Sequence, residues 1–164
     1  LLVLCAPEII KILAPSEYYE AVWVIPPIVL GLYFSFLSSL FGNIEFYYKK
    51  NVFVTIATTS AAILNIILNA IFIPKYGFVA AGYTTAVGYV ALAISHYIFM
   101  KKIQLENVYD SKKILLISVI VVVLTFMSML IYNFLIIRYI IVVIFFGIAL
   151  VALKRVIKYI KEDK

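Results

Sequence analysis

Long runs without a charged residue alternate with short basic segments along this chain of 164 residues. Four such runs cover residues 22–43, 52–74, 76–100 and 114–137, and a shorter fifth run covers 139–153. Each of the four is at least as long as the roughly 20 residues that cross about 30 Å of hydrocarbon. The alternation therefore predicts an all-α membrane protein, a polytopic helical bundle.

The basic residues sort to one side when these runs are threaded through a bilayer. Eleven of the 14 Lys and Arg residues lie at 49–50, 101–102, 112–113 and 154–164, which all fall on the same side. The other side keeps only Lys11, Lys75 and Arg138. By the positive-inside rule the basic side is cytoplasmic. We therefore expect a multi-pass membrane protein whose C-terminus is cytoplasmic.

Composition excludes several other classes of protein. The chain is 66% hydrophobic and 13% charged, whereas about a quarter of the residues of a soluble domain are charged. The net charge of +6 lies mostly in the basic loops and the tail, where topology and anionic lipid explain it, so we expect no nucleic-acid partner. A single cysteine rules out an internal disulfide and a cysteine-type metal cluster. We predict no metal, no cofactor and no enzymatic activity.

Helix boundaries follow from the uncharged runs. We expect five full helices over about 20–43, 52–74, 78–100, 114–132 and 135–153, followed by a cytoplasmic tail over 154–164. Residues 1–14 form a partial helix, because the apolar stretch covers about 20 Å, less than a full crossing. We expect this helix to begin upstream of residue 1. Pro26 and Pro27 predict a kink or a loosened turn in the second helix, and Glu45 is assigned to the inner loop.

Side-chain size differs between the predicted helices. Small residues let helix backbones approach closely, so the helix over 78–100 is expected at the centre of the bundle. The last two helices consist mainly of Ile, Val, Leu and Phe and are expected at its lipid-facing periphery. The small residues of the central helix include Ala80, Ala81, Gly82, Ala86 and Gly88.

The most polar helix is the one over 52–74. Asn65 and Asn69 are four residues apart and share one face, which Thr58 extends. Thr84 and Thr85 follow on the next helix. These side chains either line a polar cavity that meets a head group or sugar hydroxyls, or bond to adjacent helices at about 0.6 kcal/mol per contact. The sequence leaves both interpretations open.

Isolated charged residues are expected to have ordinary roles. His96 lies about one turn inside the cytoplasmic end of its helix, and a proton relay would need an intramembrane acid, which the full-length runs lack. We therefore place His96 at the interface. Glu8 and Lys11, three residues apart, are expected to pair, and Arg138 is expected to extend to the surface. Lys75 is assigned to a solvated outer turn.

Several segments carry a resemblance to a known family. The first is NIILNAIFIPKYGFVAAGYTT over 65–85, and the others are APEIIKIL over 6–13, YYEA over 18–21 and IPP over 25–27. Together these segments resemble the C-terminal region of polysaccharide flippases. These form the O-antigen-type branch of the multidrug/oligosaccharidyl-lipid/polysaccharide exporter superfamily.

The resemblance implies two six-helix lobes around a central cavity, with this chain covering most of the second lobe and an N-terminal lobe as its partner. Such proteins move an undecaprenyl-diphosphate-linked oligosaccharide across the cytoplasmic membrane by alternating access. The substrate and membrane lipids are then the other partners. A diphosphate needs cations, which the membrane runs lack. Lys11, Lys75 and Arg138 are therefore the candidate head-group contacts, unless the other lobe supplies the charge.

Three other functions fit the same sequence. A drug or cation antiporter of the same superfamily should show an intramembrane carboxylate for coupling. A membrane-embedded enzyme of polysaccharide assembly would need an acid, base or histidine at a water-accessible depth. Glu45 and His96 are weak candidates for that role. In a helical assembly subunit without transport activity, the polar faces would be packing contacts.

Overall fold

The computed structural model describes residues 1–103 and 108–162, with side chains for residues 1–103 and 108–155. Five helices of the described chain are long and apolar enough to cross a membrane, so the predicted polytopic all-α bundle is confirmed. The elements in chain order are α1 (Ala6–Leu13), the 3-10 helix η1 (Ser16–Trp23), α2 (Ile25–Tyr47), α3 (Asn51–Tyr76), α4 (Val79–Ile103), α5 (Ser111–Leu130) and α6 (Leu135–Glu162).

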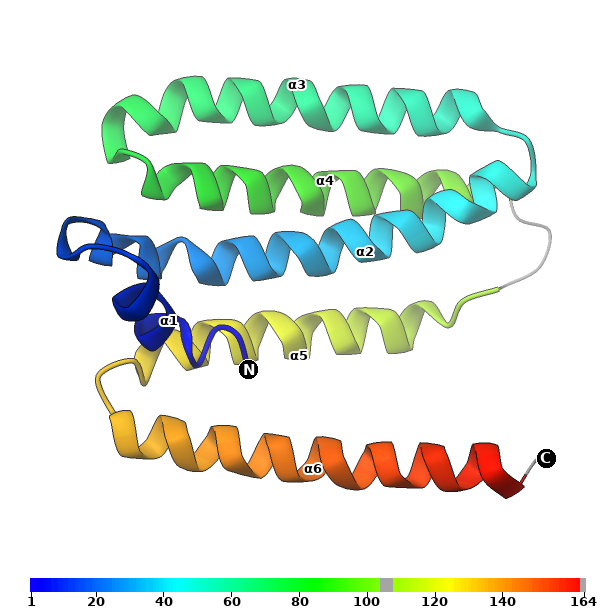
Figure 1. The fold of residues 1–164 in the computed structure, drawn as a ribbon. Coiled ribbons are helices and arrows are strands. Elements are labelled where there is room, and N and C mark those ends of the chain that lie inside the picture. The colour runs from blue at the N-terminus through cyan, green and yellow to red at the C-terminus, as the bar shows by residue number, and fades with distance from the viewer. Residues whose placement is uncertain (104–107, 163–164) are drawn as a thin grey trace.

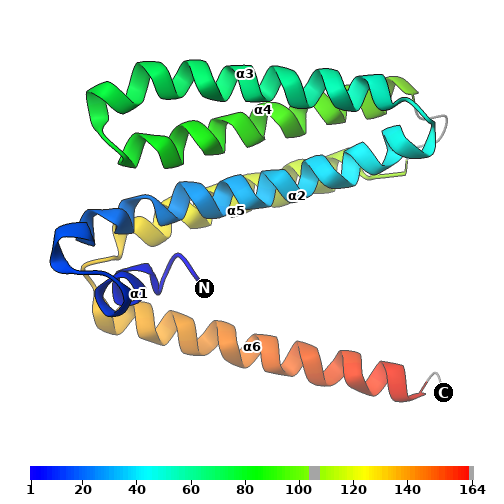
Figure 2. The ribbon, with the colours of Figure 1, turned by 45° about the horizontal axis from the view of Figure 1, so that its top comes forward.

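The helices α2 to α5 run alongside one another in alternating directions, and α4 lies between α3 and α2 (Figure 1). The predicted central position of α4 is thus confirmed. Helix α5 packs against α2, and α6 diverges from the other helices (Figure 2). The C-terminal ends of α2 and α4 and the start of α3 and α5 lie at the same end of the bundle, which we call the basic end because it carries Lys49, Lys50, Lys101 and Lys102.

Small residues allow the close approach of α2 and α4. A Cβ atom added to Gly82 would lie 2.8 Å from Cγ1 of Val24 and 3.2 Å from Cγ of Pro27. On the facing helix, a Cβ at Gly31 would lie 3.2 Å from Cδ2 of Tyr89. The two glycines therefore permit a backbone spacing that a larger residue would prevent.

The start of α2 differs from the predicted helix over 20–43. Residues Ser16–Trp23 form a 3-10 helix, and α2 begins at Ile25, with Pro26 and Pro27 in its first turn. The predicted kink is wrong, because the first N–H groups of a helix have no intrahelical partner and proline is accommodated there. Both prolines are buried.

The other end of α2 extends beyond the predicted stop at Gly42 and Asn43. The helix continues to Tyr47, so the assignment of Glu45 to a loop is wrong. A glycine within a helix costs about 1 kcal/mol relative to alanine. Burial of Phe41, which is 2% exposed, in the core with α4 outweighs that cost.

The remaining boundaries shift by a few residues, except at the C-terminus. Helix α1 covers eight residues and not 1–14, α3 extends slightly beyond both of its predicted limits, and α4 begins one residue late and continues to Ile103. Helix α6 continues to Glu162 through most of the predicted tail, since residues 154–162 contain no glycine or proline. The predicted basic link over 101–113 falls partly within α4 and α5, and residues 104–107 lie outside the described residues.

Local signals account for two of the helix ends. Asp110 caps α5: its Oδ1 accepts hydrogen bonds from the backbone N–H groups of Lys112 and Lys113, at 3.1 and 3.2 Å. Gly77 follows α3 with a φ of +71°, a conformation that favours glycine, and reverses the chain into α4. These two signals set the connections that precede α5 and α4.

Candidate functional site

The predicted polar residues meet along the seam between α3 and α4. Asn69 donates from Nδ2 to Oδ1 of Asn65 at 3.0 Å, and the hydroxyl of Thr84 donates to Oδ1 of Asn69. Thr84 is 5% exposed and also bonds the carbonyl oxygen of Ala80, at 3.1 Å. Asn69 therefore links α3 to α4, which is one of the two roles that the sequence left open, whereas the bond between Asn65 and Asn69 lies within α3.

The other predicted cavity residues lie beside this network. Thr58, Asn65 and Thr85 line a hollow of about 250 Å³ between α3 and α4, together with Gly88 and Tyr89. A Cβ at Gly88 would lie 3.4 Å from Nδ2 of Asn65, so this glycine keeps the amide accessible from α4. No residue that lines this hollow is charged. Such a surface can exchange hydrogen bonds with neutral hydroxyl-rich groups.

An ion pair between α1 and α6 lies at the end of the bundle opposite the basic end. Arg138 donates from Nη1 to Oε2 of Glu8 at 2.7 Å and from Nη2 to Oε1 at 2.6 Å. Nη1 also bonds the carbonyl oxygen of Leu4, at 2.8 Å. Arg138 is 3% exposed, so the predicted extension to the surface is wrong. The predicted pair of Glu8 with Lys11 is also wrong, because the guanidinium fork meets both carboxylate oxygens at once.

The electrostatics of Glu8 follow from this pair. Glu8 lies in α1, which is not among the five membrane-length helices. Its hydrogen bonds with Arg138 lower the pKa of the carboxyl below its usual value, although burial acts in the other direction. The carboxylate therefore stays ionised and neutralises the buried guanidinium.

A second hollow, of about 350 Å³, lies next to this ion pair. Lys11 and Arg138 both line it, with Trp23 and Tyr132, whose ring centroids are 5.5 Å apart. Burial raises the pKa of Tyr132, which follows α5, to about 12. The structure thus brings together two of the three candidate head-group contacts. Lys75 is exposed in the last turn of α3 and does not line this hollow.

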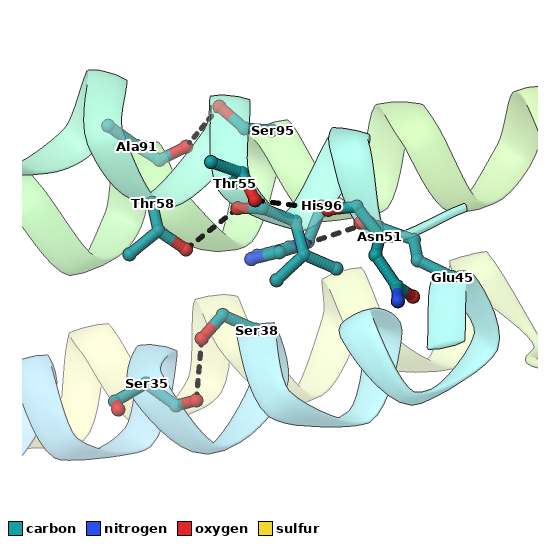
Figure 3. A network of polar contacts seen from close by, with 10 residues as sticks. Ser35, Ser38, Glu45, Asn51, Thr55, Thr58, Ala91, Ser95 and His96 are labelled. Atoms are coloured by element: carbon teal, nitrogen blue, oxygen red, sulfur yellow. Dashed lines mark hydrogen bonds and ion pairs between the residues drawn. The ribbon is translucent and has the colours of Figure 1, made fainter. Parts of the chain in front are cut away.

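The sequence did not reveal a third polar site, where α2 meets α4 near the basic end (Figure 3). His96 Nδ1 lies 2.8 Å from Oε1 of Glu45, and the two residues are 4% and 0% exposed. His96 is thus buried against α2, and its interfacial depth stays a prediction. Glu45 lies outside the uncharged run over 22–43 but within α2, so this membrane-length helix carries a carboxylate that the sequence did not predict.

A helical-face pattern could have revealed this third site. Glu45 follows the buried Leu37 and Phe41 at steps of four residues, and His96 lies between Ala93 and Met100 at steps of three and four. Residues at these spacings share one face of a helix. Had α2 been extended past Gly42, both polar residues would have been expected in the α2–α4 core.

No protein-family model matches this chain, and neither a curated protein nor a solved structure is significantly similar to it. The likeness to polysaccharide flippases therefore stays a prediction from the sequence. The fold and the three polar sites are therefore the basis for inferring the function.

Proposed function

We propose that this chain is one lobe of a flippase that moves an undecaprenyl-diphosphate-linked oligosaccharide across the cytoplasmic membrane for cell-surface polysaccharide biosynthesis. The basic end faces the cytoplasm, and the lobe alternates access by moving against another lobe. The observation that carries this proposal is the uncharged hollow on the α3–α4 seam, where Thr58, Asn65 and Thr85 add hydrogen-bonding groups to a mainly apolar lining.

The surroundings of α3 support this placement of the hollow. Among the described residues of α3 only Ala57 is buried, and Thr58 is exposed. Polar groups that face hydrocarbon are unfavourable, whereas they suit a protein interface or a water-filled cavity. A second lobe facing α3 would leave Asn65, Thr58 and Thr85 beside such a cavity. Sugar hydroxyls could then exchange hydrogen bonds with them.

The diphosphate needs a separate source of positive charge. The hollow on the seam has no cationic residue, and Arg138 is neutralised by Glu8. Lys11 and Lys75 are exposed at the outer end and are available to a head group that has crossed. During the crossing itself, the other lobe would have to supply the charge.

The test is transport in proteoliposomes, with the complete natural polypeptide that contains this lobe. A fluorescent diphosphate-linked oligosaccharide is placed in the inner leaflet, and its appearance outside is timed. We expect the Asn65→Ala/Asn69→Ala variant to transport at least about tenfold more slowly, with Ser60→Ala, an exposed position on another face of α3, as the matched control. Folded wild type that moves no such lipid would refute the proposal, and equal rates in all three proteins would make the amides packing residues.

A cation-coupled antiporter is the second candidate, and Glu45 is the observation that favours it. A carboxylate buried within a membrane-length helix is the feature that coupling requires and that the sequence did not predict. In the same liposomes, an imposed pH gradient should drive efflux of a cationic dye in wild type and not in Glu45→Gln. The burial of Glu45 and His96 supports a transporter over a membrane-embedded enzyme, which needs a water-accessible acid or base.

A further inference from the structure

We propose that Glu45 and His96 form a proton-binding site, which holds one proton between α2 and α4 and exchanges it with water at the basic end of the bundle. The ligand is the proton itself. The proposal goes beyond lipid transport and does not depend on the identity of the substrate.

The pair is enclosed by the apolar core. Met100 is 0% exposed and Phe41 2% exposed, on the same helix faces as His96 and Glu45. A Cβ added to Gly42 would lie 3.7 Å from both Cε1 and Nδ1 of the imidazole, so the ring packs directly on the α2 backbone. Figure 3 shows the carboxylate and the imidazole meeting near the first turns of α3. The bond thus links α2 to α4 through two residues that are 51 positions apart in the chain.

One atom of the pair is left without a partner. Oε2 of Glu45 is buried and accepts no hydrogen bond, while Oε1 is bonded to the imidazole. A bare carboxylate oxygen in an apolar core is very unfavourable when it carries charge. The geometry is therefore better suited to a pair that shares a proton than to a fully deprotonated one.

The surrounding charges lie toward the basic end and on several elements. The first half of α3 has no titratable residue. Among the described residues, the titratable or charged ones at this end of the elements packed around the pair are Tyr47, Tyr48, Lys49 and Lys50 after Glu45, Tyr97, Lys101 and Lys102 on α4, and Tyr109, Asp110, Lys112 and Lys113 at α5. The lysines among these residues lie at the helix ends, where their positive charge disfavours the uptake of a second proton by the pair.

The number of bound protons determines the charge of the pair. With one proton between Oε1 and Nδ1, and with Nε2 of the ring carrying a proton of its own, the pair is neutral. Loss of that proton to water leaves a net charge of −1, and uptake of a second proton leaves +1. Either charged form is disfavoured while the interface is dry. Glu45 lies two residues before the end of α2, so water can reach it when the last turn of α2 separates from α4. Proton exchange is thereby coupled to a local opening of the helix interface.

The single histidine of this chain allows a direct test. The protein is labelled with ¹⁵N-histidine, placed in lipid nanodiscs and titrated by NMR, which follows the protonation of His96 alone. We expect the ¹⁵N spectrum of wild type to show Nδ1 of His96 in a hydrogen bond with a carboxylate, as in the structure. We expect the titration midpoints of wild type and Glu45→Gln to differ by at least one pH unit, a tenfold change in proton affinity. The exposed Glu20→Gln serves as the matched control and should leave the wild-type midpoint unchanged.

Two results would overturn the proposal. One is a wild-type ¹⁵N spectrum in which Nδ1 of His96 has no hydrogen bond to a carboxylate, which is decisive even if Glu45→Gln does not fold. The other is an equal midpoint in wild type and in folded Glu45→Gln. Neither measurement involves a lipid substrate, so a failure of the proton site is distinguishable from a failure of the flippase proposal.

Discussion

The ion pair between Glu8 and Arg138 makes a quantitative prediction for the variant Glu8→Gln. Arg138 is 3% exposed, and two of its three hydrogen bonds go to the Glu8 carboxylate. Glutamine keeps one oxygen acceptor but removes the negative charge and one of the two bonds. The variant therefore leaves a buried guanidinium without a counter-ion, which weakens the attachment of α1 to α6.

The size of the free-energy loss in Glu8→Gln follows from the burial of the two partners. Removing one member of a fully buried pair costs roughly 3–5 kcal/mol. The side chain of Glu8 is 25% exposed, so water partly hydrates the guanidinium in the variant. We therefore expect a loss of about 2–3 kcal/mol in the docking of α1, which corresponds to roughly 30- to 140-fold in its opening equilibrium.

Hydrogen exchange of the α1 amides in nanodiscs measures this opening directly. The exchange rate of the α1 amides should rise roughly 30- to 140-fold in Glu8→Gln. It should change less than about threefold in Lys11→Gln, since Lys11 lacks the bidentate contact. The double variant Glu8→Gln/Arg138→Met should regain part of the protection, because it leaves no unpaired charge. Unchanged exchange in Glu8→Gln, or an equal rise in Lys11→Gln, would refute the assignment of the pair.

Three further predictions concern pH, packing and capping. The pKa of Glu8 is depressed in the folded state, so its contribution to stability is present above its unfolded pKa of about 4.5 and is lost as the pH falls through the lower folded value. The exchange protection of α1 should accordingly fall below pH 4.5, and Glu8→Gln should abolish this pH dependence. Gly82→Ala places a Cβ 2.8 Å from Val24 Cγ1 and should destabilise the protein by about 1–3 kcal/mol in thermal unfolding, whereas Gly147→Ala, which meets nothing within 4 Å, should not. Asp110→Ala should raise amide exchange in the first turn of α5, and Asp110→Asn, which can still cap the helix, should raise it less. Equal exchange in the two variants would argue against the cap.

Sequence periodicity and charge predict the fold well because a bilayer imposes strong rules on both. The five spans follow from their length, and the small residues of α4 correctly predict its central position, since Gly82 and Gly88 allow close helix contacts. The polar residues of the α3–α4 seam were also identifiable. Asn65 and Asn69 share a face on any regular helix, and a buried amide requires a partner.

The pairing of charges could not be predicted in the same way. Glu8 and Arg138 are separated by 130 positions, and nothing local distinguishes Arg138 from an arginine that extends to the surface. Glu45 was misplaced because Gly42 and Asn43 are typical of a helix end, while packing on α4 continues the helix beyond them. Both errors arise because tertiary contacts outweigh local preferences that amount to about 1 kcal/mol.

In the proposed flippase, the paired charges would also constrain how this chain handles a diphosphate. Each of the ionisable residues Glu45, His96 and Arg138, which lie within membrane-length helices and are buried, has a partner of complementary character. Such pairing neutralises charge that would be costly in a membrane, but it also removes charge that could bind a phosphate. The hollow on the α3–α4 seam is uncharged as well. A lipid diphosphate passing this surface would therefore gain hydrogen bonds to its sugars from this lobe, and most of its electrostatic stabilisation would have to come from a cationic partner surface that faces α3.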